Sequence, residues 1–137
     1  MKPKKITAII EASSTGFGIF INDDALPLTS YGDTIEEAKD DLQKVLAAML
    51  GYYKHKKEIL PKAYNMGNIE FVFQYDIASI FAHFGMLDAT NFAKKIKLNP
   101  SLLRQYKSGI TVAGEKQKKK IEAGLHELGR ELLSVRL

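Results

Sequence analysis

The sequence predicts an α+β protein in two parts: strands with one long helix over residues 1–75, then helices alone over residues 76–137. Apolar and polar residues alternate in several short stretches of the first part, which is the period of a strand. A stretch after Thr34 instead repeats apolar residues every three or four positions, and no convincing alternation follows Asp76. With 137 residues, 45% of them hydrophobic, the chain suits one domain or two small ones, and we expect two.

The strands of the first part follow from their alternation, taken in chain order. "KKITAIIEA" alternates Ile6, Ala8 and Ile10 with other residues, "SSTG" supplies a turn, and "FGIFI" returns as a second strand. "LTSYG" is a short third strand. "IEFVFQY" alternates as the last strand and ends at Tyr75.

One amphipathic helix stands between the third strand and the last. Thr34 and Glu37 have the spacing of a capping box, and Asp33 and Glu36 lie near the positive end of the helix. Its apolar positions form one helical face: Ile35, Ala38, Leu42, Val45, Leu46, Met49 and Tyr53. The predicted order is therefore β-β-β-α-β, with the helix covering one face of the sheet.

The second part contains four helical stretches: "YDIASIFAHFG", "DATNFAKKI" opened by Asp88 as a cap, "NPSLLRQYKSG", and "GEKQKKKIEAGLHELGRELLSV". The last has an apolar seam suited to burial against the body of the protein or against a twin helix: Ile121, Leu125, Leu128, Leu132 and Val135. Gly124 and Gly129 weaken this helix and would permit close approach.

The stretch "NPSLLRQYKSG" is a short helix with signals at both ends. Asn99 can accept hydrogen bonds from free amides of the first turn, Pro100 fits the first helical position, and Gly109 suits the left-handed end. Leu103 and Tyr106 supply a packing face. The residues left toward solvent are Ser101, Arg104, Gln105 and Lys107, which suit base edges and phosphates in a major groove.

With the preceding helix, "NFAKKIKLNPSLLRQYKSG" resembles the helix-turn-helix of the Cro and lambda-repressor type. The resemblance implies that Pro100, Ser101, Arg104 and Gln105 face the bases, with Lys107 and Ser108 nearer the DNA backbone. Two departures are Pro100, which carries no donor, and Lys97, which stands in the turn where glycine is usual. The alternative is a generic helical hairpin with solvated charge.

Charge is divided unevenly along the chain. Residues 1–75 carry nine Lys and Arg against ten Asp and Glu, whereas residues 76–137 carry eleven against six. A polyanion is therefore expected to meet only the second part. Lys118 and Lys119, in a basic run from Lys116 to Lys120, would rest on phosphates, or else form an ordinary solvated helix start.

Chemistry for catalysis is not indicated. His55, His83 and His126 have no partner at ligand or triad spacing, and no phosphate-binding glycine loop occurs. The acidic residues between Asp23 and Asp41 are the one candidate metal cluster, and helix-start electrostatics explains most of them. We therefore expect no catalytic residue, no metal and no cofactor.

The sequence favours a cytoplasmic protein with no membrane partner. It has no cysteine, which excludes disulfides and thiolate metal sites and suits a reducing compartment. The first apolar run has five residues before Glu11 and is too short for a signal peptide or a membrane span.

One stretch runs from "ITAIIEASSTGFGIFI" to the "GDT-EEA" helix start at Gly32 to Ala38 and includes the helix that follows. This stretch is similar to the N-terminal domain of HicB-family antitoxins. The family implies a partial RNase H-like fold over residues 1–75 without nuclease activity. It also implies binding to a HicA-type toxin, which is a small RNA-cleaving protein. The antitoxin is further expected to repress the operon that encodes it. Here "ALPLTS" replaces the Pro-Gly-Cys-like turn that members commonly have before the third strand.

The function expected is therefore that of an antitoxin whose helix-turn-helix, in residues 76–137, binds double-stranded operator DNA as a homodimer or higher homo-oligomer. The acidic helix start would face a basic toxin surface through Asp33, Glu37, Asp40 and Asp41. One alternative is a stand-alone helix-turn-helix regulator whose first part senses a ligand or only dimerises. Another is an enzyme of RNase H ancestry.

Overall fold

In a computed structural model of the chain, the described residues are 3–21, 23, 26–56 and 68–137. Those residues form four strands and five helices, which confirms the predicted α+β class. The chain divides into two compact units, Met1–His83 and Phe84–Leu137. No helix in the described part of the chain combines the length and the apolar composition that crossing a membrane requires.

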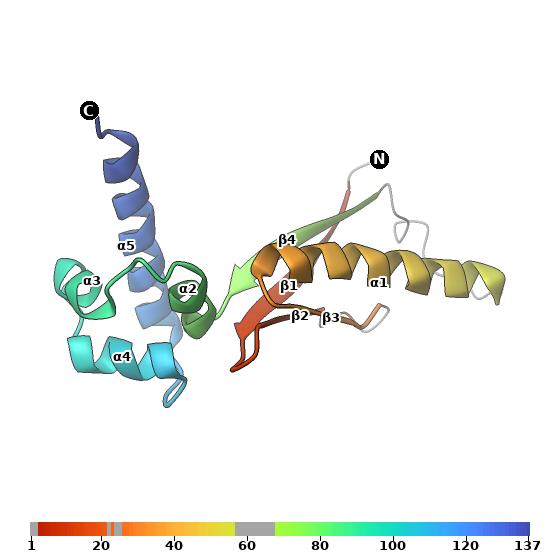
Figure 1. Cartoon of the computed structure of the whole chain (residues 1–137), viewed down its shortest axis with the longest axis horizontal. Coiled ribbons are helices and arrows are strands. Elements are labelled where there is room, and N and C mark those ends of the chain that lie inside the picture. Colours follow the sequence, from red (N-terminus) through yellow and green to blue (C-terminus); the bar gives the residue numbers. More distant parts are fainter. Residues whose placement is uncertain (1–2, 22, 24–25, 57–67) are drawn as a thin grey trace. The chain divides into compact units, whose positions relative to one another are not determined.

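The first unit is built on a four-stranded sheet (Figure 1). Its strands are β1, Lys4–Ala12; β2, Phe17–Ile21; β3, Leu28–Gly32; and β4, Ile69–Tyr75. They lie in the order β3-β2-β1-β4. β1 pairs antiparallel with β2 and parallel with β4, so Ile10 lies between Ile19 and Tyr75. The long connection that a parallel pair needs contains the helix between β3 and β4.

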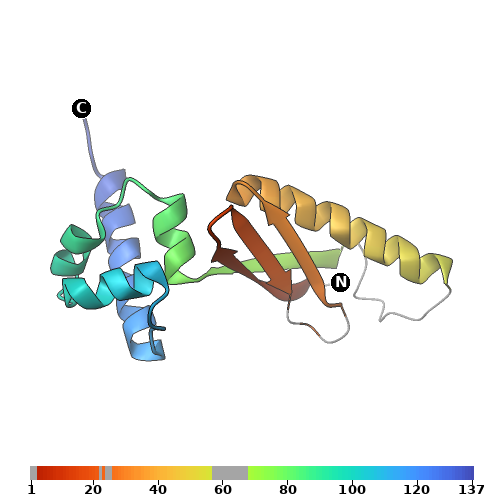
Figure 2. The same cartoon turned by 60° about the horizontal axis from the view of Figure 1, so that its bottom comes forward.

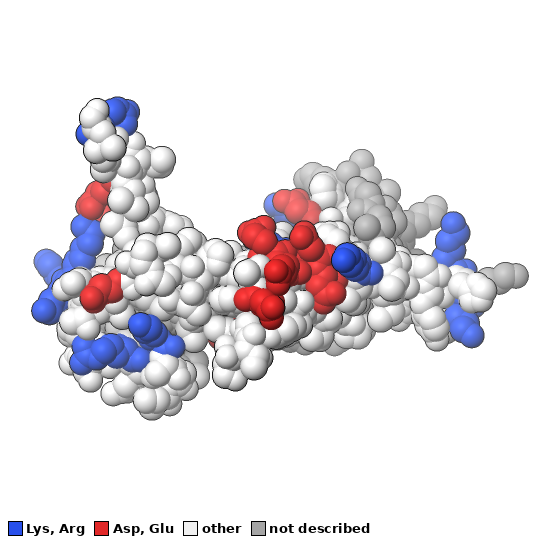
Figure 3. Space-filling model, viewed as in Figure 1, with Lys and Arg blue, Asp and Glu red and all other residues white. Residues whose placement is uncertain are grey.

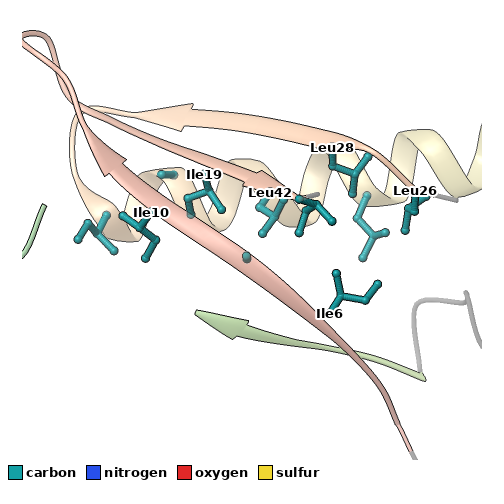
Figure 4. Close-up of a cluster of buried hydrophobic side chains, with 11 residues drawn as sticks. Ile6, Ile10, Ile19, Leu26, Leu28 and Leu42 are labelled. Atoms are coloured by element: carbon teal, nitrogen blue, oxygen red, sulfur yellow. The ribbon is translucent and has the colours of Figure 1, made fainter. Parts of the chain in front are cut away.

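Helix α1, Ile35–His55, covers one face of this sheet (Figure 2). Side chains of the strands and of α1 meet between the two layers (Figure 4). The buried apolar cluster consists of Ile6, Ala8, Ile10, Ile19, Ile21, Leu26, Leu28, Ile35, Ala38, Leu42 and Leu46. Ser30 is buried as well, and its hydroxyl donates to the carbonyl of Ala38 over 2.9 Å. The alternation predicted for the first strand thus corresponds to the face that packs on α1.

The junction between β3 and α1 gives the "GDT-EEA" stretch a physical reason. The Thr34 hydroxyl accepts from the Glu37 amide over 3.1 Å, which confirms Thr34 as the predicted cap of α1. Glu37 Oε2 accepts from the Asp33 amide over 3.0 Å, one residue before the amide that a capping box uses. A Cβ atom at Gly32 would lie 2.3 Å from the backbone nitrogen of Ala38. Only glycine lets β3 end this close to the first turn of α1.

Helix α2, Ile77–His83, begins directly after β4 and belongs to the first unit. It contacts β1, and the His83 ring lies edge-on to that of Phe17, with ring centroids 6.3 Å apart. The sequence places the division earlier, between Tyr75 and Asp76, because the strand pattern stops there. The compact unit extends past that point because α2 packs back onto the sheet.

The second unit contains α3, Ala89–Lys95; α4, Pro100–Ser108; and α5, Glu115–Leu133. Asp88 caps α3 as predicted, accepting from the Asn91 amide over 2.9 Å. Ala93 is fully buried, and α3 and α4 contact each other. The buried side chains come from all three helices and from the segments between them: Ala89, Phe92, Ala93, Leu98, Leu103, Tyr106, Ala113 and Ile121.

The turn between α3 and α4 contains a residue in the left-handed conformation. Lys97 has φ 59°, the one positive φ outside glycine among the described residues. The Leu98 amide donates to the Ala93 carbonyl over 2.9 Å, and the Lys120 ammonium donates to the Lys97 carbonyl over 2.8 Å. The sequence marks Lys97 as standing where glycine is usual, and the backbone explains that preference.

Replacing Lys97 by glycine is expected to stabilise the second unit by about 1 kcal/mol, because glycine adopts positive φ without a clash at Cβ. The carbonyl that accepts from Lys120 is retained. Urea unfolding followed by circular dichroism measures the shift in midpoint. Lys97→Ala removes the charge but keeps the Cβ, so an equal gain in this control would contradict the conformational explanation.

Gly124 of α5 lies very close to α3. A Cβ atom there would be 2.3 Å from Ile96 Cγ2 and 3.3 Å from Phe92 Cζ. At Gly129 a Cβ atom would meet no atom of the described structure within 4 Å. Close approach is therefore found at the first of these glycines and not at the second.

The two glycines give opposite predictions for the same substitution. Gly124→Ala is expected to destabilise the second unit by about 1–3 kcal/mol, because Ile96 is branched at Cβ and must move with its backbone. Gly129→Ala is expected to stabilise it by about 0.5–1 kcal/mol through helix propensity. Thermal unfolding of both variants checks the pair; a gain in stability for Gly124→Ala would show that α5 does not pack on α3 in this way.

Candidate functional site

Helix α4 is capped at both ends as the sequence predicts. The Asn99 side chain accepts from the amides of Ser101 and Leu102, over 2.8 and 3.3 Å, and Pro100 opens the helix. Gly109 ends it with φ 78° in the left-handed region. Because these caps satisfy backbone groups that a helix end leaves free, a helix of nine residues is held with definite ends.

The two faces of α4 differ in chemistry. Leu103 is fully buried and Tyr106 is 7% exposed, which confirms the predicted packing face. The residues predicted to meet DNA lie on the same helix: Pro100 is half-buried, and Ser101, Arg104, Gln105, Lys107 and Ser108 are exposed. Figure 3 shows basic side chains over α4. The Ser108 hydroxyl donates to the carbonyls of Arg104 and Gln105, so it is already used within the helix.

Thr90, in the first turn of α3, is a site residue that the sequence did not indicate. Its hydroxyl accepts from Arg104 Nη1 over 2.9 Å, which joins the exposed surfaces of α3 and α4. Thr90, Arg104 and Lys107 line one hollow together with the segment from Gly85 to Ala89, which includes Asp88. The only sequence signal for Thr90 is its place two residues after the cap of α3.

Lys118 and Lys119 lie in the first two turns of α5 and are exposed. They are therefore on a different helix from the other predicted DNA contacts, which lie on α4. Lys118 Nζ is 3.5 Å from Glu115 Oε1, an exposed pair of small energetic value. Lys120 holds the turn before α4 through the Lys97 carbonyl. The lysine run thus combines one structural contact with exposed charge.

Two of the four acidic residues predicted to meet a toxin have a structural role. Glu37 Oε2 accepts from the Asp33 amide just before α1, and Asp41 Oδ2 accepts from the Tyr31 amide on the edge strand β3 over 3.0 Å. Both carboxylates therefore stabilise the junction between β3 and α1. The sequence indicated a helix-start role for Glu37 but not the role of Asp41, because the bond between Asp41 and Tyr31 depends on where α1 lies over the sheet.

The other acidic side chains at this end of α1 are exposed and make no hydrogen bond or ion pair with the described part of the chain: Asp33, Glu36 and Asp40. Figure 3 shows acidic side chains gathered over the first turns of α1. Glu36 was not among the predicted contacts. Glu36 lies beside Asp33 and Asp40 at the start of α1. The acidic surface that is available to a partner therefore consists of Asp33, Glu36 and Asp40.

Among the described residues, no group of three or more His, Asp or Glu side chains is placed so that it could hold a metal ion. His55 and His126 are exposed, and His83 packs against Phe17. Two surfaces bring together residues that the sequence predicts to meet a partner: the exposed face of α4 with the start of α3, and the acidic start of α1.

No family model, no curated protein and no solved structure matches this chain.

Proposed function

We propose that this chain is a HicB-like antitoxin that acts in the cytoplasm, binding double-stranded operator DNA through α4 and neutralising a small RNA-cleaving toxin of the HicA type through its first unit. The proposal rests mainly on the caps of α4 and on the difference between its buried and exposed faces. A short helix capped at both ends buries Leu103 and Tyr106 and leaves Ser101, Arg104 and Gln105 exposed.

The features of α3 and α4 support a helix-turn-helix of the Cro and lambda-repressor type. Ala93 is a small buried residue at the contact with α4, Lys97 has the left-handed backbone that such a turn uses, and Leu98 is buried beneath it. A side-chain amide such as that of Gln105, exposed on this helix, is a group that pairs with adenine in a major groove. Surrounding Lys side chains suit phosphates.

The first unit supports the antitoxin part of the proposal. Its β-β-β-α-β order, with β1 parallel to β4, agrees with the partial RNase H-like fold that the HicB resemblance implies. The "GDT-EEA" stretch is needed for the close crossing of β3 and α1, so the residues that carry the resemblance also determine the local structure.

The end of α5 supports a homodimer or a higher homo-oligomer. Ile121 is buried, whereas Leu132 is 62% exposed and Val135 is 55% exposed. The apolar seam therefore begins inside the second unit and continues on its surface. A second copy would cover these residues, and two copies would present two α4 helices to paired half-sites.

Co-expression tests the proposal as a whole. The full chain, made together with the small protein encoded beside its gene, is expected to purify as a complex and to rescue growth. The same preparation should retard DNA from upstream of the operon in a gel. DNA binding without any toxin would favour a stand-alone regulator, and RNA or DNA cleavage by the pure chain would favour the enzyme.

Charge reversal at the acidic surface is expected to slow toxin binding. The variant Asp33→Lys, Glu36→Lys, Asp40→Lys should lower the association rate about 10-fold or more at low salt, because steering by complementary charge acts mainly on encounter. Glu37 and Asp41 are left unchanged because they hold the fold. Stopped-flow mixing with the neighbouring toxin measures the rate.

The matched control reverses three exposed carboxylates of α5: Glu115, Glu122 and Glu127. It changes the net charge equally but leaves the first unit unaltered. Circular dichroism should show both variants folded. Equal association rates for the two variants would reject the acidic start of α1 as the toxin surface.

A further inference from the structure

The Arg104 side chain is turned back toward α3. Its Nη1 atom donates to the Thr90 hydroxyl over 2.9 Å, although the two residues are fourteen positions apart. A guanidinium has five N–H donors, and this bond uses one of them. Arg104 is exposed, so the other donors face solvent. The hydrogen bond directs the guanidinium toward the start of α3.

Lys107 lies close to Arg104 and Thr90. It stands one helical turn after Arg104 on α4, and both side chains line the hollow that Thr90 and the segment from Gly85 to Ala89 complete. Asp88 also lines this hollow, but its Oδ1 accepts from the Asn91 amide as the cap of α3. Two cations against one carboxylate leave the hollow with a net positive charge.

We propose that Thr90, Arg104 and Lys107 form a clamp for one phosphate diester of the DNA backbone. This inference rests on the proposed DNA binding through α4. The Thr90 hydroxyl accepts from Arg104 and keeps its own hydrogen to donate to a phosphate oxygen. Arg104 supplies paired N–H donors to the same phosphate, and Lys107 supplies charge.

The clamp changes the role that the sequence assigns to Arg104. The first helix of a helix-turn-helix crosses the DNA backbone when the second enters the major groove. A guanidinium held at α3, the first of the two helices, would therefore lie on the phosphate side of the motif. Arg104 then sets the position of α4 on the duplex, and base reading falls to Ser101 and Gln105. Thr90 acts as a positioning residue, because it aligns Arg104.

The test compares the full chain with Arg104→Gln on two labelled duplexes: the one that the native chain binds most tightly in a random library, and one of scrambled sequence. Fluorescence anisotropy gives both affinities across about 50–200 mM salt. The variant is expected to weaken both duplexes by the same factor. The slope of log affinity against log salt should fall by about 0.9, which is about 3-fold over this range.

Thr90 variants test the positioning role. Thr90→Val should weaken both duplexes equally and leave the salt slope unchanged, because the charge of Arg104 remains. Thr90→Ser keeps the hydroxyl and should restore native binding. Native affinity in Thr90→Val would overturn the positioning role. Lys44→Gln, the same kind of charge change on α1, is the control and should alter neither duplex.

A second outcome would overturn the clamp itself. If Arg104→Gln weakens the preferred duplex alone and the salt slope stays native, Arg104 reads a base, while DNA binding through α4 still stands. If the native chain binds neither duplex, the proposed function fails and the clamp with it.

Discussion

Leu103→Ala is expected to unfold the second unit and to abolish DNA binding by the full chain. Leu103 is fully buried on the face of α4 that packs within the unit, and truncation of such a leucine costs about 2–5 kcal/mol. A unit of this size has little stability to spare. Thermal unfolding followed by circular dichroism should show the helical signal of the second unit lost or its midpoint greatly lowered.

Leu133→Ala is the matched control for this prediction, because the same atoms are removed from a side chain that is 80% exposed. Its free energy of unfolding should change by less than about 0.5 kcal/mol. If both variants unfolded alike, or if Leu103→Ala stayed as stable as the native chain, the packing of α4 described above would be wrong.

Loss of sequence preference is the second large effect. Ser101→Ala combined with Gln105→Ala should lower the ratio of specific to non-specific DNA affinity about 10-fold or more, since each good base contact contributes about 1–3 kcal/mol. Neither side chain makes a hydrogen bond within the second unit, so the fold should be unaffected. Competition between preferred and scrambled duplexes measures the ratio.

Gln43→Ala on α1 provides the control for this pair. Gln43 is also an exposed glutamine within a helix, but it belongs to the first unit. It should leave the affinity ratio at the native value. A native ratio in the Ser101 and Gln105 variant as well would mean that α4 does not read bases.

Local patterns in the sequence were sufficient for most elements of the fold. The alternation of Ile6, Ala8 and Ile10 identified the face of β1 that is buried, and the spacing of Thr34 and Glu37 identified the start of α1. These features depend on neighbours within a few residues. The strand order and the parallel pairing of β4 depend on contacts between distant segments, which periodicity does not report.

The candidate site was predictable to the same extent. The caps and faces of α4 follow from residues 99–109 alone. Two hydrogen bonds join separate elements: Arg104 to Thr90, and Tyr31 to Asp41. Neither could be predicted from residues close together in the sequence. Arg104 and Asp41 were both predicted to bind a partner. In the folded chain each of them also makes a hydrogen bond to another element of its own unit.

Selection of DNA from a random duplex library by the full chain shows whether α4 reads sequence, and it requires no known operator. We expect enrichment of one motif in two related half-sites, and loss of that enrichment when Ser101 and Gln105 are both alanine. Enrichment of no motif by the native chain, or of the same motif by the double variant, would contradict this expectation.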